Sequence, residues 1–367
     1  MKKIAIIGGG IVGATAAYLL SKEPGYAVTL FDQETGQATK AAAGIISPWL
    51  SKRRNQKWYA LASDGAHFIA QLAQETGMSP QTYLQSGTIV TRKDPQALDA
   101  LEALAHERRQ SVPMMGKIER LTRTQIKERM PLVTADLQGV FISGGARIDG
   151  QRFVADLLKL SQQNGSQIWH EKVMLKNDQT VQTTHQDLTF DVILLCAGAG
   201  VNELLAPLGY EVTVHPQKGQ LIELKVPTYP EDQYAPVLMP EGEKDFMPIG
   251  NGRLIIGATH ENEPEFDLEF TQEAFDELVA SAQRMDANIH KSDLLATRVG
   301  TRAFTDDFSP FFGWLPENSH VLVASGLGSS GLTTGPLVAK LMTTMLTQQT
   351  SYANYQKDIE TYLHKKE

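Results

Sequence analysis

The stretch that decides the fold begins at the second residue: KKIAIIGGGIVGATAAYLLSKEPGYAVTLFD, residues 2 to 32. Its first apolar residues, rich in β-branched side chains, predict a buried parallel strand. Gly8, Gly10 and Gly13 follow at the spacing G-x-G-x-x-G, and the Ala-rich residues 11–22 predict a helix directly behind them. In such a unit the glycines permit a tight turn, a close approach of backbone to a pyrophosphate and close helix–strand packing, while the helix amides hold the phosphates.

A carboxylate ends the next expected strand. Residues 26–31 predict that strand, and Asp32 follows it, 24 positions after Gly8. An acidic residue about 20 positions along accepts hydrogen bonds from an adenosine ribose. The stretch therefore predicts a dinucleotide site, and a carboxylate here argues against the 2′-phosphate of NADP. Both NAD and FAD remain open on this stretch alone.

Composition sets the outer limits. With 367 residues the chain is long for one core, so two domains are expected. A net charge of −8 argues against a nucleic-acid partner, and the absence of a long apolar run argues against a membrane span. The single cysteine, Cys196, predicts a buried thiol, and the nine histidines show no metal-ligand spacing. We therefore expect a cytoplasmic protein without a metal.

One basic run, SKRRNQK at 51–57, goes against the acidic balance of the chain. A solvated loop is the commoner reason for such a run. The alternative is a contact with an anionic substrate or with a cofactor phosphate.

Along the chain, segments typical of a nucleotide-binding α/β layer alternate with segments of antiparallel character. Residues 188–197 are apolar throughout and predict a central strand, whereas 219–226 alternate and predict a half-exposed antiparallel strand. Residues 325–336, SGLGSSGLTTGP, predict a second glycine turn, with a helix from 337 to 348. A nicotinamide-binding domain does not require that second turn.

Several motifs resemble, in this order, the FAD-dependent D-amino acid oxidase family, most closely its glycine oxidase and sarcosine oxidase branches. They are the first glycine turn with Asp32, ATKAAAGI, LLCAGAG, PQKGQ, GATHE and the block from VGTRAFTDDFSPFFGWLPE to SGLGSSGLTTGP. The resemblance runs from about residue 3 to residue 348. It favours FAD, because the Ala-rich loop and the second glycine turn have a role against a flavin and none against NAD.

The resemblance implies an α/β plus antiparallel β architecture. A Rossmann-like FAD-binding domain would be built from the discontinuous segments 1–83, 140–212 and 297–367. A second, mainly antiparallel substrate domain would comprise 84–139 and 213–296.

The resemblance also implies site residues. The glycine turn would hold the pyrophosphate and Asp32 the ribose. Small residues from Ala42 onward would pass the flavin ring, the backbone of Val173 would meet the adenine, and the amides of the last turn would face the pyrimidine edge of the flavin, where such donors stabilise developing negative charge. The cofactor-binding candidates are Gly8, Gly10, Ile11, Val12, Gly13, Asp32, Gln33, Ala42, Ala43, Gly44, Ile45, Val173, Ala197, Gly198, Gly326, Gly328, Ser329, Ser330, Gly331 and Leu332.

Arg302 matches the family arginine that pairs with the substrate carboxylate, a task that suits its planar fork. Strand alternation would place Arg298 and Arg302 on one face, so both could face the same cavity. Structural roles remain open: a surface salt bridge of Arg302 with Asp306 or Asp307, core packing for the alanines of the loop, and turn formation for the last glycines.

The sequence departs from the family in three places. The stretch DFMPIGNG has Phe246 and Met247 and no tyrosine, where glycine oxidase carries one that helps hold the substrate. Leu327 and Ser329 stand where the family often has histidine and arginine. No cysteine lies near the arginine segment, so FAD is expected to be bound noncovalently.

Taken together, the resemblance implies an FAD-dependent amino acid oxidase or dehydrogenase. It would oxidise the C–N bond of a small amine or amino acid of the glycine, sarcosine or D-amino acid type, by hydride transfer to the flavin. Dioxygen or another acceptor would take the electrons, and a homo-oligomer is possible. Three alternatives remain: 2-hydroxy acid oxidation with His260 as base, a flavin component of a biosynthetic or RNA-modification route, and a flavin-binding sensor without turnover.

Overall fold

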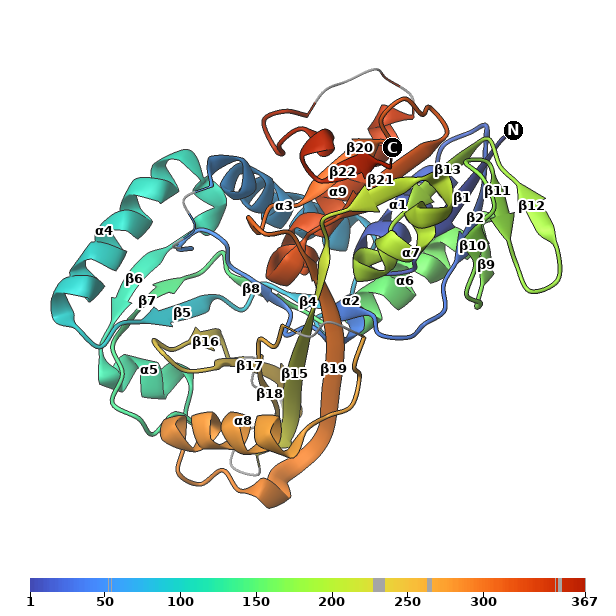
Figure 1. The fold of residues 1–367 in the computed structure, drawn as a ribbon. Helices are drawn as coiled ribbons and strands as arrows, with labels where there is room; N and C mark the ends of the chain where they lie inside the picture. The colour runs from blue at the N-terminus through green and yellow to red at the C-terminus, as the bar shows by residue number, and fades with distance from the viewer. Residues whose placement is uncertain are drawn as a thin grey trace.

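The computed structural model describes all residues except 52, 54, 227–234, 263–265, 347, 349–351 and 367. Two large sheets organise it (Figure 1). Both chain termini lie at the end of the molecule that holds the mainly parallel sheet. Within the described ranges, no helix has both the length and the hydrophobicity needed to cross a bilayer.

The first sheet has six strands in the order β20-β21-β13-β1-β2-β9, and only β20 runs antiparallel to its neighbour. Alternate residues of β1 enter two different hydrophobic clusters, so this strand is buried on both faces, as in a covered parallel sheet. The strands are β1 (Lys2–Ile7), β2 (Tyr26–Phe31), β9 (Gln167–Trp169), β13 (Val192–Leu195), β20 (Phe311–Trp314) and β21 (Val321–Ser325).

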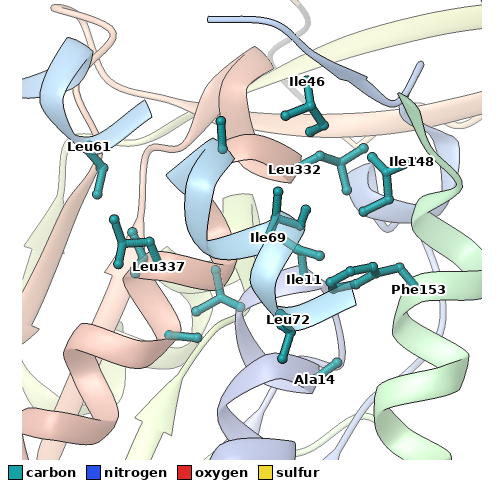
Figure 2. Packing of buried hydrophobic residues seen from close by; sticks show 14 of the residues in the cluster. Ile11, Ala14, Ile46, Leu61, Ile69, Leu72, Ile148, Phe153, Leu332 and Leu337 are labelled. Atoms are coloured by element: carbon teal, nitrogen blue, oxygen red, sulfur yellow. The ribbon is translucent and has the colours of Figure 1, made fainter. Parts of the chain in front are cut away.

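Four helices cover one face of this sheet. α1 packs against α6 and α9, and α3 packs against α9. Figure 2 shows their shared core, in which Ile11, Ile69, Phe153 and Leu332 converge from four different helices. The helices are α1 (Ile11–Ser21), α3 (Gln56–Glu75), α6 (Gly150–Gln163) and α9 (Gly331–Met345).

Smaller elements flank this layer. Three two- or three-stranded sheets occur, with the orders β10-β11-β12, β14-β22 and β3-β8-β4. Their strands are β3 (Ile45–Ile46), β4 (Tyr83–Leu84), β8 (Ala146–Ile148), β10 (Met174–Leu175), β11 (Thr180–Gln182), β12 (Asp187–Thr189), β14 (Tyr210–Val212) and β22 (Leu363–Lys365), and the short helices are α2 (Ala38–Ala41) and α7 (Val201–Leu205).

The second large sheet has eight strands in the order β19-β15-β18-β17-β16-β5-β7-β6 and is antiparallel except for the pair β16 and β5. Helix α8 lies along it and α4 lies beside β6 and β7 (Figure 1). Its strands are β5 (Thr88–Thr91), β6 (Ile118–Leu121), β7 (Gly139–Ile142), β15 (His215–Lys225), β16 (Val237–Met239), β17 (Asp245–Gly250), β18 (Arg253–Gly257) and β19 (Leu294–Phe304), and its helices are α4 (Pro95–Ser111), α5 (Arg123–Arg129) and α8 (Gln272–Met285).

The two sheets confirm the predicted fold class, a Rossmann-like layer combined with an antiparallel one. Their strands alternate along the chain in the way the sequence predicts. The exact segment boundaries, 1–83, 140–212 and 297–367 against 84–139 and 213–296, stay predictions.

Two strand predictions are wrong. Residues 188–197 form two strands, because the chain breaks at Phe190 and Asp191: β12 joins a small sheet and β13 the centre of the parallel one. The strand predicted at 219–226 forms part of β15, whose residues 218–224 are buried on both faces, and polar side chains of this strand are paired. Gln220 donates to Glu261 at 2.9 Å, and Lys218 pairs with Asp267 at 2.5 Å.

The second glycine turn is shorter than predicted. A single 3-10 turn, η5 (Gly328–Ser330), leads into α9, which begins at Gly331 instead of Leu337. Pro336 lies inside the first turns of α9. Because proline has no N–H, the carbonyl of Leu332 one turn earlier lacks its usual intrahelical hydrogen bond.

Gly65 tests the packing of α3 on α9. A Cβ at this position would overlap the backbone carbonyl of Thr333 in α9. Gly65→Ala should therefore lower the free energy of unfolding by about 1–3 kcal/mol, the usual cost of overpacking. Urea titration measures it, with exposed Gln74→Ala in the same helix as a control expected within about 0.5 kcal/mol of the parent. An equally stable Gly65 variant would contradict the close contact.

Candidate active site

The first cavity, of about 430 Å³, lies at the carboxyl ends of β1, β2 and β13. Ligands of open α/β sheets bind at this edge. The residues predicted to hold a dinucleotide gather around it: Gly8, Gly10, Ile11, Val12, Asp32, Gln33, Val173, Ala197 and Gly198.

The start of α1, from Gly10 to Val12, lines this cavity. Its N-cap, Gly10, offers no side-chain cap, and no acidic residue stands in the first turn. The amide of Ile11 donates to the hydroxyl of Thr39 at 3.0 Å. Gly13 does not line the cavity but packs against the turn, where a Cβ would overlap the carbonyl of Gly8. The absence of a side chain at Gly13 allows α1 to pack closely against the turn that follows β1.

Asp32 is buried at the end of β2, with 8% of its surface exposed. Its backbone amide donates to the carbonyl of Trp169 at 3.0 Å, which fixes the strand end. Gln37 donates to its carboxylate. The carboxylate therefore lies at the wall of the first cavity.

A second cavity, of about 420 Å³, adjoins the first, since Ala38, Thr39, Gly328 and Gly331 line both. It is lined from both large layers, by α2, η5 and α9 on one side and by β15, β17, β18 and β19 on the other. Predicted flavin contacts gather here: Ala42, Ala43, Gly44, Ile45, Ser329, Ser330 and Leu332. Gly326 lines neither cavity and packs beside Ser309.

Arg302 reaches the second cavity from β19. Its Nη1 donates to the carbonyl of Thr259 at 3.1 Å and to Oε1 of Gln217 at 3.3 Å. Burial lowers the pKa of Arg302 to about 10, against the opposing effect of Glu261, so the group stays charged at neutral pH. A Cβ on Gly219 of the neighbouring strand would lie 2.5 Å from Nη2. Glycine thus leaves the space that the guanidinium occupies.

The surface salt bridge considered for Arg302 is wrong. Asp306 pairs with His215 at 2.9 Å and Asp307 with Lys357 at 2.5 Å. In the part of the chain that the structure describes, no carboxylate lies within ion-pair distance of Arg302, and its Nη2 and Nε make no hydrogen bond. One edge of the fork is therefore free for a ligand.

The expectation that Arg298 and Arg302 face one cavity is also wrong. Arg298 does not line the second cavity and instead pairs with buried Glu223 of β15 at 3.1 Å. Arg253 binds the same carboxylate. Of the two arginines of β19, therefore, Arg302 lines the second cavity and Arg298 does not.

Sequence reasoning missed Asp245. It begins β17, directly before Phe246 and Met247, which are both buried in the core and do not line the cavity. The Asp245 side chain lines the second cavity, where burial raises its pKa to about 7, with Lys244 opposing. The signal was available, because an acid at the head of an otherwise apolar strand is unusual.

His260 follows β18 and also lines the second cavity. Burial is the main reason why its pKa lies below the ordinary value, and Arg302 and Lys244 lower it further. The ring is therefore neutral near pH 7.

A family model for FAD dependent oxidoreductases matches residues 3–345. The chain belongs to this family. It is 37% identical to the uncharacterized oxidoreductase YurR of Bacillus subtilis over 95% of this chain and 96% of that one. It is 27% identical to glycine oxidase of Pseudomonas putida over 94% of both chains. The structure of iminodiacetate oxidase from Chelativorans superposes with a TM-score of 0.89 at 30% identity, covering 96% of this chain and 98% of that one.

FAD is the cofactor of this family, and the chemistry of the two cavities fits it. The first offers helix amides for a pyrophosphate and Asp32 for a ribose. The second offers small side chains and a glycine turn where a flat ring could lie. Cys196 is buried with its pKa raised to about 12, so the one thiol of the chain is a poor nucleophile, which favours noncovalent binding.

Asp32→Ala tests the ribose contact. Loss of a charge-assisted hydrogen bond of about 1.5–3 kcal/mol should weaken FAD binding by roughly 10- to 100-fold. Titration of apoprotein with FAD, followed by flavin fluorescence, measures the dissociation constant. Exposed Glu23→Ala serves as the control for loss of one negative charge and should leave it unchanged. Unchanged affinity in both variants would remove Asp32 from the site.

Proposed function

We propose that this flavoenzyme oxidises the C–N bond of a small amino acid to an imine, which water hydrolyses to a keto acid and ammonia or an amine. The observation that carries the proposal is the unpaired guanidinium edge of Arg302 in the second cavity. Two relatives are named as oxidases of glycine and of iminodiacetate. Both compounds carry a carboxylate one carbon from the nitrogen, which supports the proposal.

Arg302 and Asp245 would orient such a substrate. The planar fork of Arg302 suits both oxygens of the α-carboxylate. The carboxylate of Asp245 can accept hydrogen bonds from the ammonium and can take its proton, since its pKa lies near 7. Contacts at both the carboxylate and the ammonium would restrict the position of the α-carbon.

Bound FAD supplies the acceptor for the hydride that leaves the α-carbon. The protein contributes orientation, exclusion of water and a place for the amine proton. The amides of η5 and the start of α9, at Gly328 to Leu332, would face the ring edge where negative charge develops. Dioxygen or another acceptor would then reoxidise the cofactor.

Oxidation of a 2-hydroxy acid, with His260 as base, is the weaker proposal. A carboxylate forms an ion pair with an ammonium group, whereas the neutral hydroxyl of a 2-hydroxy acid can only donate a hydrogen bond to it. The one carboxylate that lines the second cavity within the described residues, Asp245, therefore favours an amine.

Arg302→Met tests the proposed function. It should lower substrate affinity or catalytic efficiency by about 2–5 kcal/mol, roughly 30- to 4,000-fold, with FAD still bound. Arg302→Lys should recover only part, because an ammonium cannot reproduce the fork. The measurement is anaerobic flavin bleaching by glycine, sarcosine, D-amino acids, proline and 2-hydroxy acids.

Arg298→Lys is the matched control, since it keeps a cation beside Glu223 and lies outside the cavity. It should bleach like the parent protein. If Arg302→Met is bleached as efficiently as the parent protein, Arg302 does not bind the substrate carboxylate. If only 2-hydroxy acids bleach the flavin, the proposal of amine oxidation is wrong.

Asp245→Asn tests the amine contact through pH. In the parent protein Asp245 becomes a carboxylate as pH rises through about 7, so affinity for an ammonium substrate should rise over the same range. Burial lowers the pKa of His260 below its ordinary value, away from pH 7, and Arg302 stays charged in this window. The Asn variant should lose the rise and bind roughly 10- to 100-fold more weakly above pH 7.

Dissociation constants from pH 5.5 to 8.5 measure this effect. Glu277→Gln provides the control, because it removes the partner of Lys244 at 2.7 Å without touching the cavity. It should keep the rise. A parent protein whose affinity is flat across pH 7 would contradict the role of Asp245.

A further inference from the structure

The basic run 51–57 sends one side chain into the second cavity. Lys52 and Arg54 lie outside the described residues, but Arg53 lines the cavity together with Arg302. The run was expected to be either a solvated loop or a contact with an anionic group. The position of Arg53 does not fit the solvated loop. The group is half-buried, and burial lowers its pKa from the ordinary value.

The position of Arg53 is fixed by contacts that leave its charge uncompensated. Its guanidinium lies over the ring of Trp58, 4.6 Å from the centroid, and its Nη2 donates to the hydroxyl of Ser329 at 3.1 Å. The indole Nε1 of Trp58 in turn donates to the hydroxyl of Ser330 at 3.0 Å, so contacts from α3 and η5 together hold the Arg53 side chain in place. Among the described residues, no carboxylate lies within ion-pair distance of Arg53.

The charges on the wall of the second cavity bear on the kind of substrate. Among the described residues, the charged groups that line this cavity are Arg53, Asp245 and Arg302. A simple amino acid has one carboxylate and one ammonium, which would occupy Arg302 and Asp245 and leave Arg53 without a partner. A substrate with two carboxylates and one ammonium matches all three groups. Uncompensated charges in partly desolvated positions are costly, so the second match is favoured.

We propose that Arg53 binds a second carboxylate of the substrate, and that the enzyme therefore prefers amino acids with two carboxylates over those with one. The inference rests on the proposed function, in which Arg302 holds the first carboxylate. The fork of Arg53, together with the Ser329 hydroxyl, supplies donors for this second group.

The test compares compounds that differ only in that charge. Iminodiacetate is paired with its monoamide, which has the same shape and one charge fewer, and D- and L-aspartate are paired with D- and L-asparagine. The first pair places the second carboxylate beyond the nitrogen, and the other pairs place it on the carbon side chain. Anaerobic flavin bleaching gives the rate, and perturbation of the flavin spectrum gives binding even without turnover.

In the parent protein at least one dicarboxylate should exceed its amide by about 30-fold or more in binding or in reduction efficiency. Arg53→Met should bring that ratio to near one while the amide keeps its parent values within about threefold. Arg53→Lys should restore part of the preference. Arg302→Met should weaken both members of the pair.

Exposed Arg109→Met on α4 is the matched control for loss of one arginine and should keep the full ratio. Equal binding of acid and amide by the parent protein would overturn the inference while leaving amino acid oxidation intact. So would an Arg53 variant that weakens both compounds alike or loses FAD, because Arg53 would then serve the cofactor. If dicarboxylates bind selectively but no compound bleaches the flavin, the proposed function fails and the assignment of Arg53 stands.

Discussion

The second cavity depends on one constraint: the guanidinium of Arg302 is partly withdrawn from water, and no carboxylate of the described residues lies within ion-pair distance of it. Such a charge costs free energy unless other groups compensate it. The carbonyl of Thr259 and the amide oxygen of Gln217 supply part of the compensation. The missing side chain of Gly219 provides the space. Groups on β15 and in the loop after β18 therefore surround the Arg302 side chain of β19. The remaining edge of its guanidinium can bind an anion.

The pairing of β15 with β19 carries this arrangement to the place where the two layers meet. Their register sets Gln217 opposite Arg302 and Gly219 opposite Gly300. Gly300 in turn packs against Ala41 of α2, so the long strands approach the layer that holds the glycine turns. A cofactor held by one layer and a substrate held by the other can meet there. Neither layer could build the second cavity by itself.

The contrast between paired and unpaired charges among the described residues supports the proposed role of the second cavity. On β15, Lys218 pairs with Asp267, and Glu223 is held by Arg253 and Arg298. These charges lie outside the cavity and are satisfied within the protein. Arg53, Asp245 and Arg302 line the cavity and have no ion-pair partner among the described residues. Clustered groups of this kind are typical of sites that bind charged ligands.

The sequence by itself determined the strand–turn–helix unit at the amino terminus, the place of Asp32, and the order of the α/β and antiparallel segments. These features follow from local pattern, since spacing of glycines and apolar residues sets them within about 30 residues. Only the tertiary structure decided which arginine of β19 faces the cavity. Arg298 and Arg302 share one face by alternation, but Glu223, 75 residues away in the chain, takes the first. Asp245 and Arg53 came into the cavity in the same way, because folding brings together side chains whose partners the linear sequence does not reveal.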